Sequence, residues 1–340
     1  MNFTSSPFER MMKEKPRPQA PAKNRPPRGS ACCGCCYWRG GSCGSLFWCC
    51  FLGRGLGGGF FWFFLLFVGG FLGAWVFFLV APAAGRKELR TPFAGRNFAH
   101  RGYFGKDQRP PANSLPAFAA AVQNGYGMEM DVQFSSDRKL LVFHDDTLTR
   151  MTGTKAWVRD YPYDQICQMP LKGSAEHAPL FSEFLQTVDG KTPLIIEIKS
   201  RHEYTGEYLD ALCHATLDGL KGYNGPYCIE SFDPRVVKRI RKFAPQVLRG
   251  QLVDSYRAYR KEGANPIHAF VVSHCFGNFM ARPDFIAWCP DKQNWAVRLC
   301  ARLGAMMVMW TALPEHDQAA LEKQYDAVIF QWYHPEVKYK

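Results

Sequence analysis

Four short segments of the chain combine ionisable side chains with apolar neighbours. They are AHRG at 99–102, MEMDV at 128–132, FHDD at 143–146 and IIEIKS at 195–200. Glu129 and Asp131 stand two residues apart, as do Glu197 and Lys199, so each pair lies on one face if its segment is a strand. Carboxylates buried between apolar neighbours need a cation or several hydrogen-bond donors. The spacing therefore predicts a charged site rather than a solvated surface.

The elements that must position these residues follow from the pattern after residue 96. Short apolar runs alternate there with longer helical patterns, which indicates parallel βα units. We expect helices at 114–123, capped by Asn113, and at 234–243, capped by Asp233. The run LLVFHDD is expected to fold back as a hairpin arm on the second strand. Strands are expected at Phe98–Arg101, Met128–Val132, Leu194–Lys199, Tyr227–Phe232, Leu248–Leu252, Ala269–Ser273, Met306–Thr311 and Ala327–Gln331.

Eight parallel strands in about 240 residues predict an α/β fold, the (β/α)8 TIM barrel, in which the C-terminal strand ends meet at one mouth. His100 and Arg101 end the first strand, and Gly102 would let the chain turn there. Taken singly, a Glu-x-Asp pair is usually a solvated strand face, and a strand-end histidine is usually structural. Their joint placement at one barrel end favours a functional site. Of the other histidines, only His202 lies close enough in sequence to contribute.

The chain resembles the glycerophosphodiester phosphodiesterase family in segments that occur in the family's order. The resemblance runs from Asn97 to Pro335, and its most specific part is the combination of His-Arg-Gly, Glu-x-Asp and His-Asp-Asp. The matching segments are AHRG, ANSLPAF, MEMDVQFSSDRKLLVFHDDTLTR, IIEIKS, IESFDPRVVKRIRKFAP and VMWTALPEHDQAAL.

The resemblance implies hydrolysis of glycerophosphodiesters or lysophospholipid-type diesters to glycerol phosphate and an alcohol, with a divalent cation, calcium or magnesium. Such hard cations suit oxygen ligands. Positive charge is needed on the non-bridging phosphate oxygens, and histidines can divide the base and acid roles. The implied positions are Glu129, Asp131 and Glu197 for the metal, His100 and His144 for catalysis, and Arg101 and Lys199 for phosphate.

By the same resemblance, His100 is the base, acting on water or a glycerol hydroxyl, and His144 is the acid, with the reverse order left open. Two positions depart from the family pattern. Ala112 stands where Pro-Glu-Asn usually has glutamate, and Gln331 stands where the last strand usually has a carboxylate. A catalytically weak, membrane-anchored phosphodiester- or lipid-binding protein on the same barrel is therefore the alternative. A phosphoinositide-cleaving phospholipase C lacks support from an inositol-site pattern.

The first 96 residues differ sharply from the rest. The chain of 340 residues carries a net charge of +12, and the basic, Cys- and Pro-rich tail at 1–54, expected to be disordered, holds much of that charge. No nucleic-acid motif accompanies it, so no nucleic-acid partner is expected. Juxtamembrane cysteines there can be acylated or remain free thiols. The basic residues are Arg10, Lys13, Lys15, Arg17, Lys23, Arg25, Arg28, Arg39 and Arg54.

A membrane segment is expected at 55–85, which contains no charged residue. About 20 apolar residues span a bilayer as a helix, and Phe60 to Val80 exceeds that length. A buried core helix or a cleaved signal peptide ending at APAAG are the alternatives. Basic residues stay cytoplasmic, so the tail is expected inside and the barrel, residues 96–340, outside. The prediction is a single-pass membrane protein with an extracytoplasmic barrel.

Overall fold

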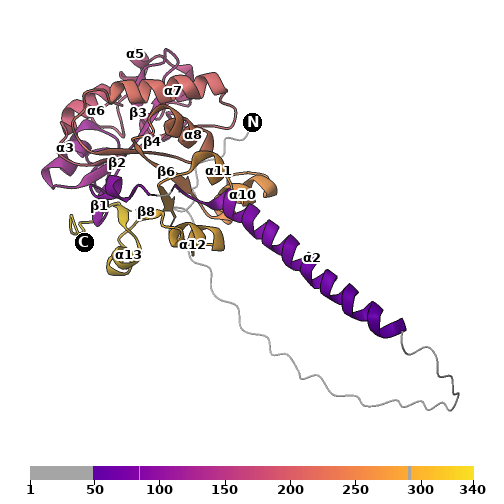
Figure 1. The fold of residues 1–340 in the computed structure, drawn as a ribbon. Helices are drawn as coiled ribbons and strands as arrows, with labels where there is room; N and C mark the ends of the chain where they lie inside the picture. Colours follow the sequence, from indigo (N-terminus) through magenta and orange to yellow (C-terminus); the bar gives the residue numbers. More distant parts are fainter. Residues whose placement is uncertain (1–48, 84, 290–291) are drawn as a thin grey trace, which may run out of the picture. The chain divides into compact units, whose positions relative to one another are not determined.

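The computed structural model of the chain describes residues 49–83, 85–289 and 292–340 (Figure 1). Residues from Phe77 to Lys340 form one compact unit, which contains the barrel. Residues 1–48, which make up most of the predicted basic tail, lie outside the described residues. The disorder expected for the tail therefore stays a prediction there.

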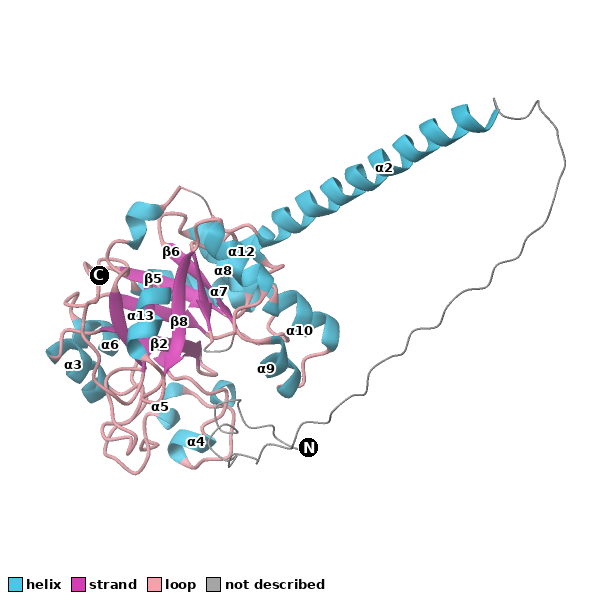
Figure 2. Cartoon of the chain, turned by 90° about the horizontal axis from the view of Figure 1, so that it is seen from below, coloured by secondary structure: helices cyan, strands magenta, loops and turns pink. Residues whose placement is uncertain are grey.

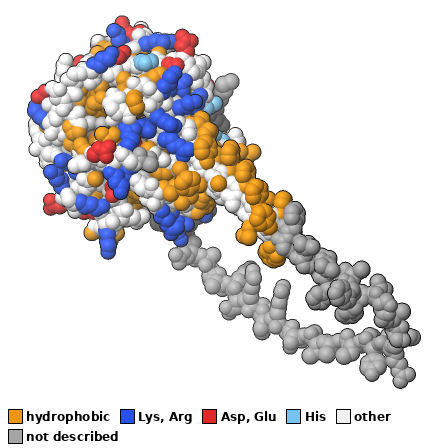
Figure 3. All heavy atoms as spheres, in the orientation of Figure 1, with side chains coloured by type: hydrophobic (Ala, Val, Ile, Leu, Met, Phe, Trp, Pro, Cys, Tyr) orange, Lys and Arg blue, Asp and Glu red, His pale blue; other side chains and the backbone are white. Residues whose placement is uncertain are grey.

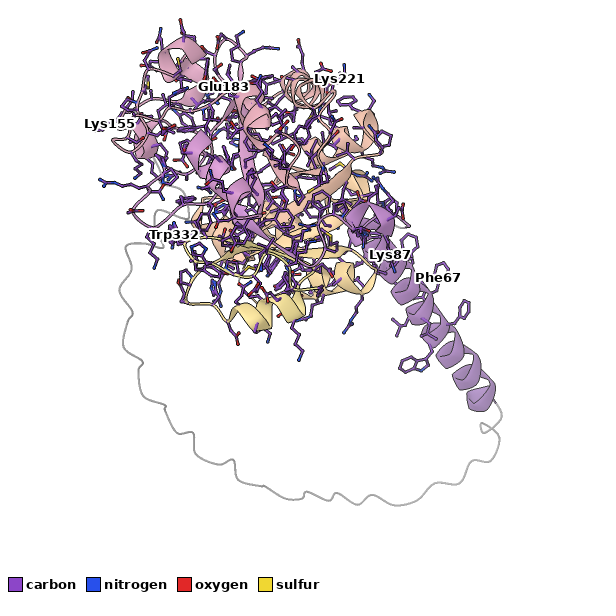
Figure 4. The ribbon with its side chains drawn as sticks, turned by 90° about the vertical axis from the view of Figure 1, so that its left-hand side faces the viewer. Phe67, Lys87, Lys155, Glu183, Lys221 and Trp332 are labelled. Carbon is purple, nitrogen blue, oxygen red and sulfur yellow. The ribbon has the colours of Figure 1, made fainter. Side chains whose placement is uncertain are left out.

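Helix α2, Cys49–Val80, covers most of the predicted membrane segment. Within it, Trp62–Val80 has a mean hydropathy of 2.5 and is, in the described part of the chain, the one helix long and apolar enough to cross a membrane. Its side chains are mostly exposed, and Phe67 projects freely from the helix in Figure 4. That exposure is unlike a buried core helix, which was one of the alternatives.

The eight-stranded parallel barrel predicted from the sequence is confirmed. Hydrogen bonding runs in the order β1-β9-β8-β7-β6-β5-β4-β2, and β1 also pairs with β2, so the sheet closes on itself. Figure 2 shows the strands in magenta at the centre with helices around them. The barrel strands are β1 Arg96–His100, β2 Gly127–Phe134, β4 Leu194–Ile198, β5 Tyr227–Ser231, β6 Leu248–Val253, β7 Phe285–Trp288, β8 Met306–Ala312 and β9 Ala327–Phe330.

The helices follow the strands in the expected alternation, with extra short helices in two connections. The α-helices after α2 are α3 Leu115–Gln123, α4 Thr149–Thr152, α5 Tyr163–Ile166, α6 Phe181–Val188, α7 Gly206–Gly219, α8 Pro234–Phe243, α9 Tyr256–Lys261, α10 Pro266–Ser273, α11 Asn278–Ala281, α12 Trp295–Arg302 and α13 Gln318–Gln324. The 3-10 turns are η1 Lys87–Arg90 and η2 Val158–Asp160.

One predicted strand is wrong. Ala269–Ser273 belongs to helix α10, and the sixth barrel strand is β7 further along the chain. Asn265 caps α10, since its side chain accepts a hydrogen bond from the backbone N–H of His268 at 2.8 Å, and Pro266 occupies the first turn. A side-chain cap and a first-turn proline both favour a helix start, and they outweigh the β-branched pair inside the run.

The hairpin arm on the second strand is confirmed. Strand β3, Leu140–Val142, pairs antiparallel with β2, with Val132 opposite Val142. The arm returns the chain to the mouth, because the backbone N–H of Phe143 donates to the carbonyl of Asp131 at 3.0 Å. His144 is thereby carried to the end of the strand that holds the first two carboxylates.

Below the mouth, the barrel interior is filled by apolar side chains, including Phe98, Ile195, Leu248 and Phe285. The ring of Phe285 lies across Gly250 of the neighbouring strand, where an added Cβ would come within 2.0 Å of a ring carbon. Only glycine allows this approach, so the interior closes with an aromatic plug.

Candidate active site

Three carboxylates meet inside the mouth of the barrel. Glu129 and Asp131 come from β2 and Glu197 from β4, and strand pairing places Asp131 directly beside Glu197. One oxygen of each residue lies within 4.8 Å of the other two, and all three side chains are buried. The donors are all carboxylate oxygens, which is the ligand type that calcium and magnesium prefer. The residues present therefore fit a hard divalent cation.

Two basic side chains lie against this group. The Nζ atom of Lys199 is 2.8 Å from Oε1 of Glu197 and 3.3 Å from Oδ1 of Asp131. The Nε atom of Arg101 is 3.6 Å from Oδ2 of Asp131. The structure thus brings together both residues that the sequence assigns to phosphate. Their placement beside the carboxylates puts fixed positive charge at the same point of the mouth.

The protein's own cations do not compensate the three carboxylates equally. Burial acts to raise the pKa of Asp131, but the positive charges around it, led by Lys199, hold that pKa well below its usual range. Burial raises the pKa of Glu197 to about 7. Burial and the charge of Asp131 together raise the pKa of Glu129 well above its usual range. Two carboxyls therefore resist ionisation on their own, and a divalent cation would supply the missing charge.

A fourth acidic residue, Glu230, was not predicted. It lies on β5, in register with Glu197, and its side chain is buried. Its Oε2 atom has no hydrogen-bond partner among the described residues, and burial, reinforced by the charge of Glu197, raises its pKa well above normal. The signal in the sequence is a lone acidic residue in the apolar run YCIES. Its position beside Glu197 depends on strand register, which that run does not reveal.

The first histidine is oriented by a neutral amide. Nδ1 of His100 is hydrogen-bonded to Oε1 of Gln331, the residue after β9. Because an amide oxygen can only accept, Nδ1 carries the proton and Nε2 is the basic nitrogen. Nε2 lies 3.7 Å from Oε2 of Glu129 and so faces the carboxylate group. Burial, aided by Arg101, lowers the pKa of His100 well below its usual value, so the ring is neutral near pH 7.

The second histidine is paired with a carboxylate instead. Nδ1 of His144 lies 2.6 Å from Oδ1 of Asp145, and Arg150 holds the same carboxylate through Nε at 2.6 Å and Nη2 at 2.9 Å. Burial and the cations Arg101 and Lys199 lower the pKa of His144 to about 4, while Asp145 acts in the opposite direction. The two histidines thus have partners of different charge.

Asn113 has a different role from the one predicted. The N-cap of α3 is Ser114, whose hydroxyl accepts from the backbone N–H of Ala117, and the side chain of Asn113 donates to Oδ2 of Asp131 at 2.8 Å. Its backbone has a positive φ of 59°, which asparagine tolerates better than most residues. The sequence pattern around Asn113 is typical of a helix cap, so its contact with Asp131 was not predicted.

The turn after β1 follows the expectation for Gly102. Its φ is +85°, and an added Cβ would lie 2.9 Å from the backbone carbonyl carbon of Ala117 in α3. The loop therefore passes against α3 at a distance that only glycine permits. His202, by contrast, is exposed and pairs with Glu203 at 3.2 Å, away from the buried group.

Three aromatic residues near the candidate site, Phe232, Trp310 and Trp332, lie in two places. Phe232 and Trp310 pack edge to face with ring centroids 5.3 Å apart, both half-buried above the interior core. Trp332, labelled in Figure 4, packs with Phe104 and Ala112. Ala112 thus stands in an apolar cluster, so a glutamate at that position would lose hydration against aromatic surface.

The sequence of the chain also matches a family of known proteins. Residues 100–331 match the model of the glycerophosphoryl diester phosphodiesterase family. A glycerophosphodiester phosphodiesterase of Caldanaerobacter subterraneus is 27% identical over 66% of this chain and 88% of its own. One of Bacillus altitudinis is 34% identical over 31% of this chain and 44% of its own. A lysophospholipase D of Rattus norvegicus is 29% identical over 39% and 45%.

Solved structures agree on the fold. An Oleispira antarctica phosphodiesterase in complex with the product sn-glycerol-3-phosphate has a TM-score of 0.54 at 19% identity, covering 70% of this chain and 93% of that one. A Silicibacter pomeroyi glycerophosphoryl diester phosphodiesterase has a TM-score of 0.57 at 20% identity, covering 70% and 90%. At these identities the likeness supports the barrel alone, whereas the family model spans most of the barrel and both histidines. The chain belongs to the glycerophosphoryl diester phosphodiesterase family.

Proposed function

We propose that this chain is a membrane-anchored phosphodiesterase that hydrolyses glycerophosphodiesters to glycerol phosphate and an alcohol, or lysophospholipid-type diesters to acylated glycerol phosphate and an alcohol. One observation carries the proposal: three buried carboxylates, two basic side chains and two histidines converge on the same barrel mouth. Glu129, Asp131 and Glu197 would hold calcium or magnesium, which supplies positive charge to the non-bridging phosphate oxygens when bound.

The other residues divide the remaining work. Arg101 and Lys199 bind phosphate oxygens and keep the diester in place. His100 takes a proton on Nε2 from the attacking water or glycerol hydroxyl, and the new P–O bond forms as the bond to the alcohol oxygen breaks. Attack by the glycerol hydroxyl gives a cyclic phosphate, which a water molecule then opens to the monoester. His144 gives a proton to that oxygen, so the alcohol leaves neutral. The neutral state of His100 supports its role as the base. The pKa of about 4 leaves His144 neutral near pH 7 as well, so its acid role rests on its carboxylate partner, Asp145, and on the family resemblance.

The direct test is hydrolysis by the purified full chain. Glycerophosphocholine and lysophosphatidylcholine would be offered with calcium, with magnesium and with neither, and the released phosphate ester and choline measured. Turnover that depends on the cation and on both histidines supports the proposal. Binding of the diesters without turnover would favour the catalytically weak binding protein instead. The neutral Gln331 and apolar surroundings of Ala112 are the observations on that side.

We also propose that α2 anchors the chain with the basic tail inside and the barrel outside. The charge before residue 55 supports this orientation. Protease added to intact cells would digest the barrel and spare the tail. Protection of the barrel would reverse the orientation without affecting the catalytic proposal.

The partner of His144 gives a testable pH effect. Asp145 raises the pKa of His144, so Asp145→Asn is expected to lower it. A general acid must be protonated, and the alkaline limb of kcat should therefore move down by about one pH unit, with lower turnover near pH 7. The control is Asp146→Asn, since Asp146 pairs with Arg201 instead. An unchanged alkaline limb in Asp145→Asn would contradict the acid role of His144.

A further inference from the structure

Large exposed apolar side chains are not scattered over the barrel. We consider the described residues of the unit from Phe77 onward, without the last turn of α2. All large exposed apolar side chains of this part lie in the connections between β6 and β8. They are 38–78% exposed, with Ile267 the most exposed. We name this set the apolar patch: Tyr256, Ile267, Phe270, Phe279 and Trp295.

The apolar patch has a built framework beneath it. The ring of Phe270 lies 5.7 Å from that of Phe276, and Phe276 lies 6.2 Å from Trp295. His274 lies between Phe270 and Trp295, at 4.1 and 5.7 Å. Helices α10 and α12 are thereby joined through one aromatic cluster. A contiguous exposed surface of this kind on a folded domain indicates an interaction site.

The patch is continuous with the last turn of α2, which belongs to the same compact unit. The ring of Phe279 lies 6.0 Å from that of Phe78. The amide of Asn278 donates to the carbonyl of Val80 at 2.7 Å, and Arg282 donates to that of Ala81 at 2.7 Å. Figure 3 shows hydrophobic side chains gathered on the barrel surface around the end of α2, with Lys and Arg beside them. The segment apolar enough to enter a membrane thus ends at this patch.

Charge around the patch is mostly positive. Residues 255–302 contain more basic than acidic side chains, and one of the acidic residues, Asp284, is buried. Exposed aromatic and aliphatic side chains bordered by Lys and Arg are typical of surfaces that lie on anionic membranes. The basic residues of this stretch are Arg257, Arg260, Lys261, Arg282, Lys292, Arg298 and Arg302.

The same stretch reaches the active-site mouth. Strand β6 ends at Val253, and α9 follows at the C-terminal end of the barrel. The connection that carries Tyr256, Ile267, Phe270 and Phe279 therefore starts at the mouth and runs to the start of β7 at Phe285, near the opposite end of the barrel.

We propose that the apolar patch rests on the membrane surface, with Ile267 and Phe270 inserted at the lipid headgroups and the surrounding basic side chains facing the lipid phosphates. The inference deepens the proposed function and rests on it for the substrate. A mouth beside that surface would receive lysophospholipid-type diesters from the membrane, whereas water-soluble diesters would not need the patch.

The test is the full chain with Ile267→Glu and Phe270→Glu together, reconstituted into vesicles of phosphatidylcholine and phosphatidylglycerol. Hydrolysis of lysophosphatidylcholine in the vesicles should fall about tenfold or more, because two apolar contacts with lipid are lost. The kcat/KM for soluble glycerophosphocholine should stay unchanged. The control is Lys221→Glu, which changes the net charge by the same amount at an exposed position. Figure 4 shows that Lys221 lies away from Lys87, which is the first residue of η1 and marks the part of the chain just after α2.

Hydrogen exchange of the same vesicle samples supplies a readout independent of activity. Exchange across α9 and α10 should be slower in the parent chain than in the variant, with α6 and α7 as the internal reference. Equal exchange in both chains, or equal loss on both substrates, would overturn the membrane-surface role. If the parent chain hydrolyses neither diester, the proposed function fails, and the exchange comparison still decides whether the patch lies on lipid.

Discussion

Replacing His100 or His144 with alanine is expected to reduce diester hydrolysis by about 10²–10⁴-fold, the usual contribution of a positioned acid or base. His100 is buried with Nε2 directed at the carboxylate group, and His144 is held by an Asp145–Arg150 pair. Neither change removes apolar packing on the scale of a core residue, so the fold should remain. The measurements are kcat and KM on glycerophosphocholine, together with the melting temperature of each variant.

His202→Ala is the matched control for these two substitutions. His202 follows the strand that carries Glu197 and Lys199, yet its side chain is 89% exposed and pairs with Glu203. Its loss should leave kcat within about a factor of two, because exposed ion pairs contribute little. Turnover in His100→Ala equal to that of the parent chain would show that His100 is not the base.

Removal of the divalent cation is expected to abolish turnover and to lower the melting temperature by about 5–10 °C. The second effect follows because a ligand at 100 times its dissociation constant stabilises a domain by about 2.7 kcal/mol, and each kcal/mol shifts the melting temperature by about 2–4 °C at this size. Burial raises the pKa values of Glu129 and Glu197, so without a cation these groups take up protons or repel Asp131. Thermal melts and assays after EDTA treatment, with calcium or magnesium added back, would show both effects.

A single ligand substitution should separate the cation from general electrostatics. Glu129→Gln keeps the shape of the side chain and removes one charge, and it is expected to cost about 10²–10³-fold in kcat and to weaken cation binding measured by calorimetry. Glu207→Gln, on the exposed first turn of α7, is the control. Full activity after exhaustive chelation would show that the carboxylates have a purely structural role.

The barrel was predictable because parallel strands buried on both faces appear as apolar runs, and seven of the eight were recognised. The sixth, β7, has only four residues, and the longer run at 269–273, with two adjacent valines, has the pattern of a strand. Nothing in that run itself signals a helix. The decisive contacts are at its start, where Asn265 caps the first turn.

The candidate site was predictable where side chains with charge follow an apolar strand, as at His100, Asp131 and Glu197. Contacts made through neighbouring strands were missed. Gln331 was recognised only as a departure from the family pattern, and it reaches His100 because β9 pairs with β1. Glu230 was missed altogether, and it lies beside Glu197 because β5 pairs in register with β4. Pairing between distant strands is a property of the closed sheet, and a single segment does not encode it.

The neutral partner of His100 has a consequence for the number of protons that control the rate. A carboxylate in that place would itself take up a proton in acid, so base and partner would titrate together. The amide of Gln331 accepts the same hydrogen bond at every pH. While a bound cation keeps Glu129 and Glu197 ionised, the acidic decline of activity should then follow the uptake of a single proton by His100. The enzyme would keep its base correctly oriented in media acidic enough to neutralise a carboxylate partner.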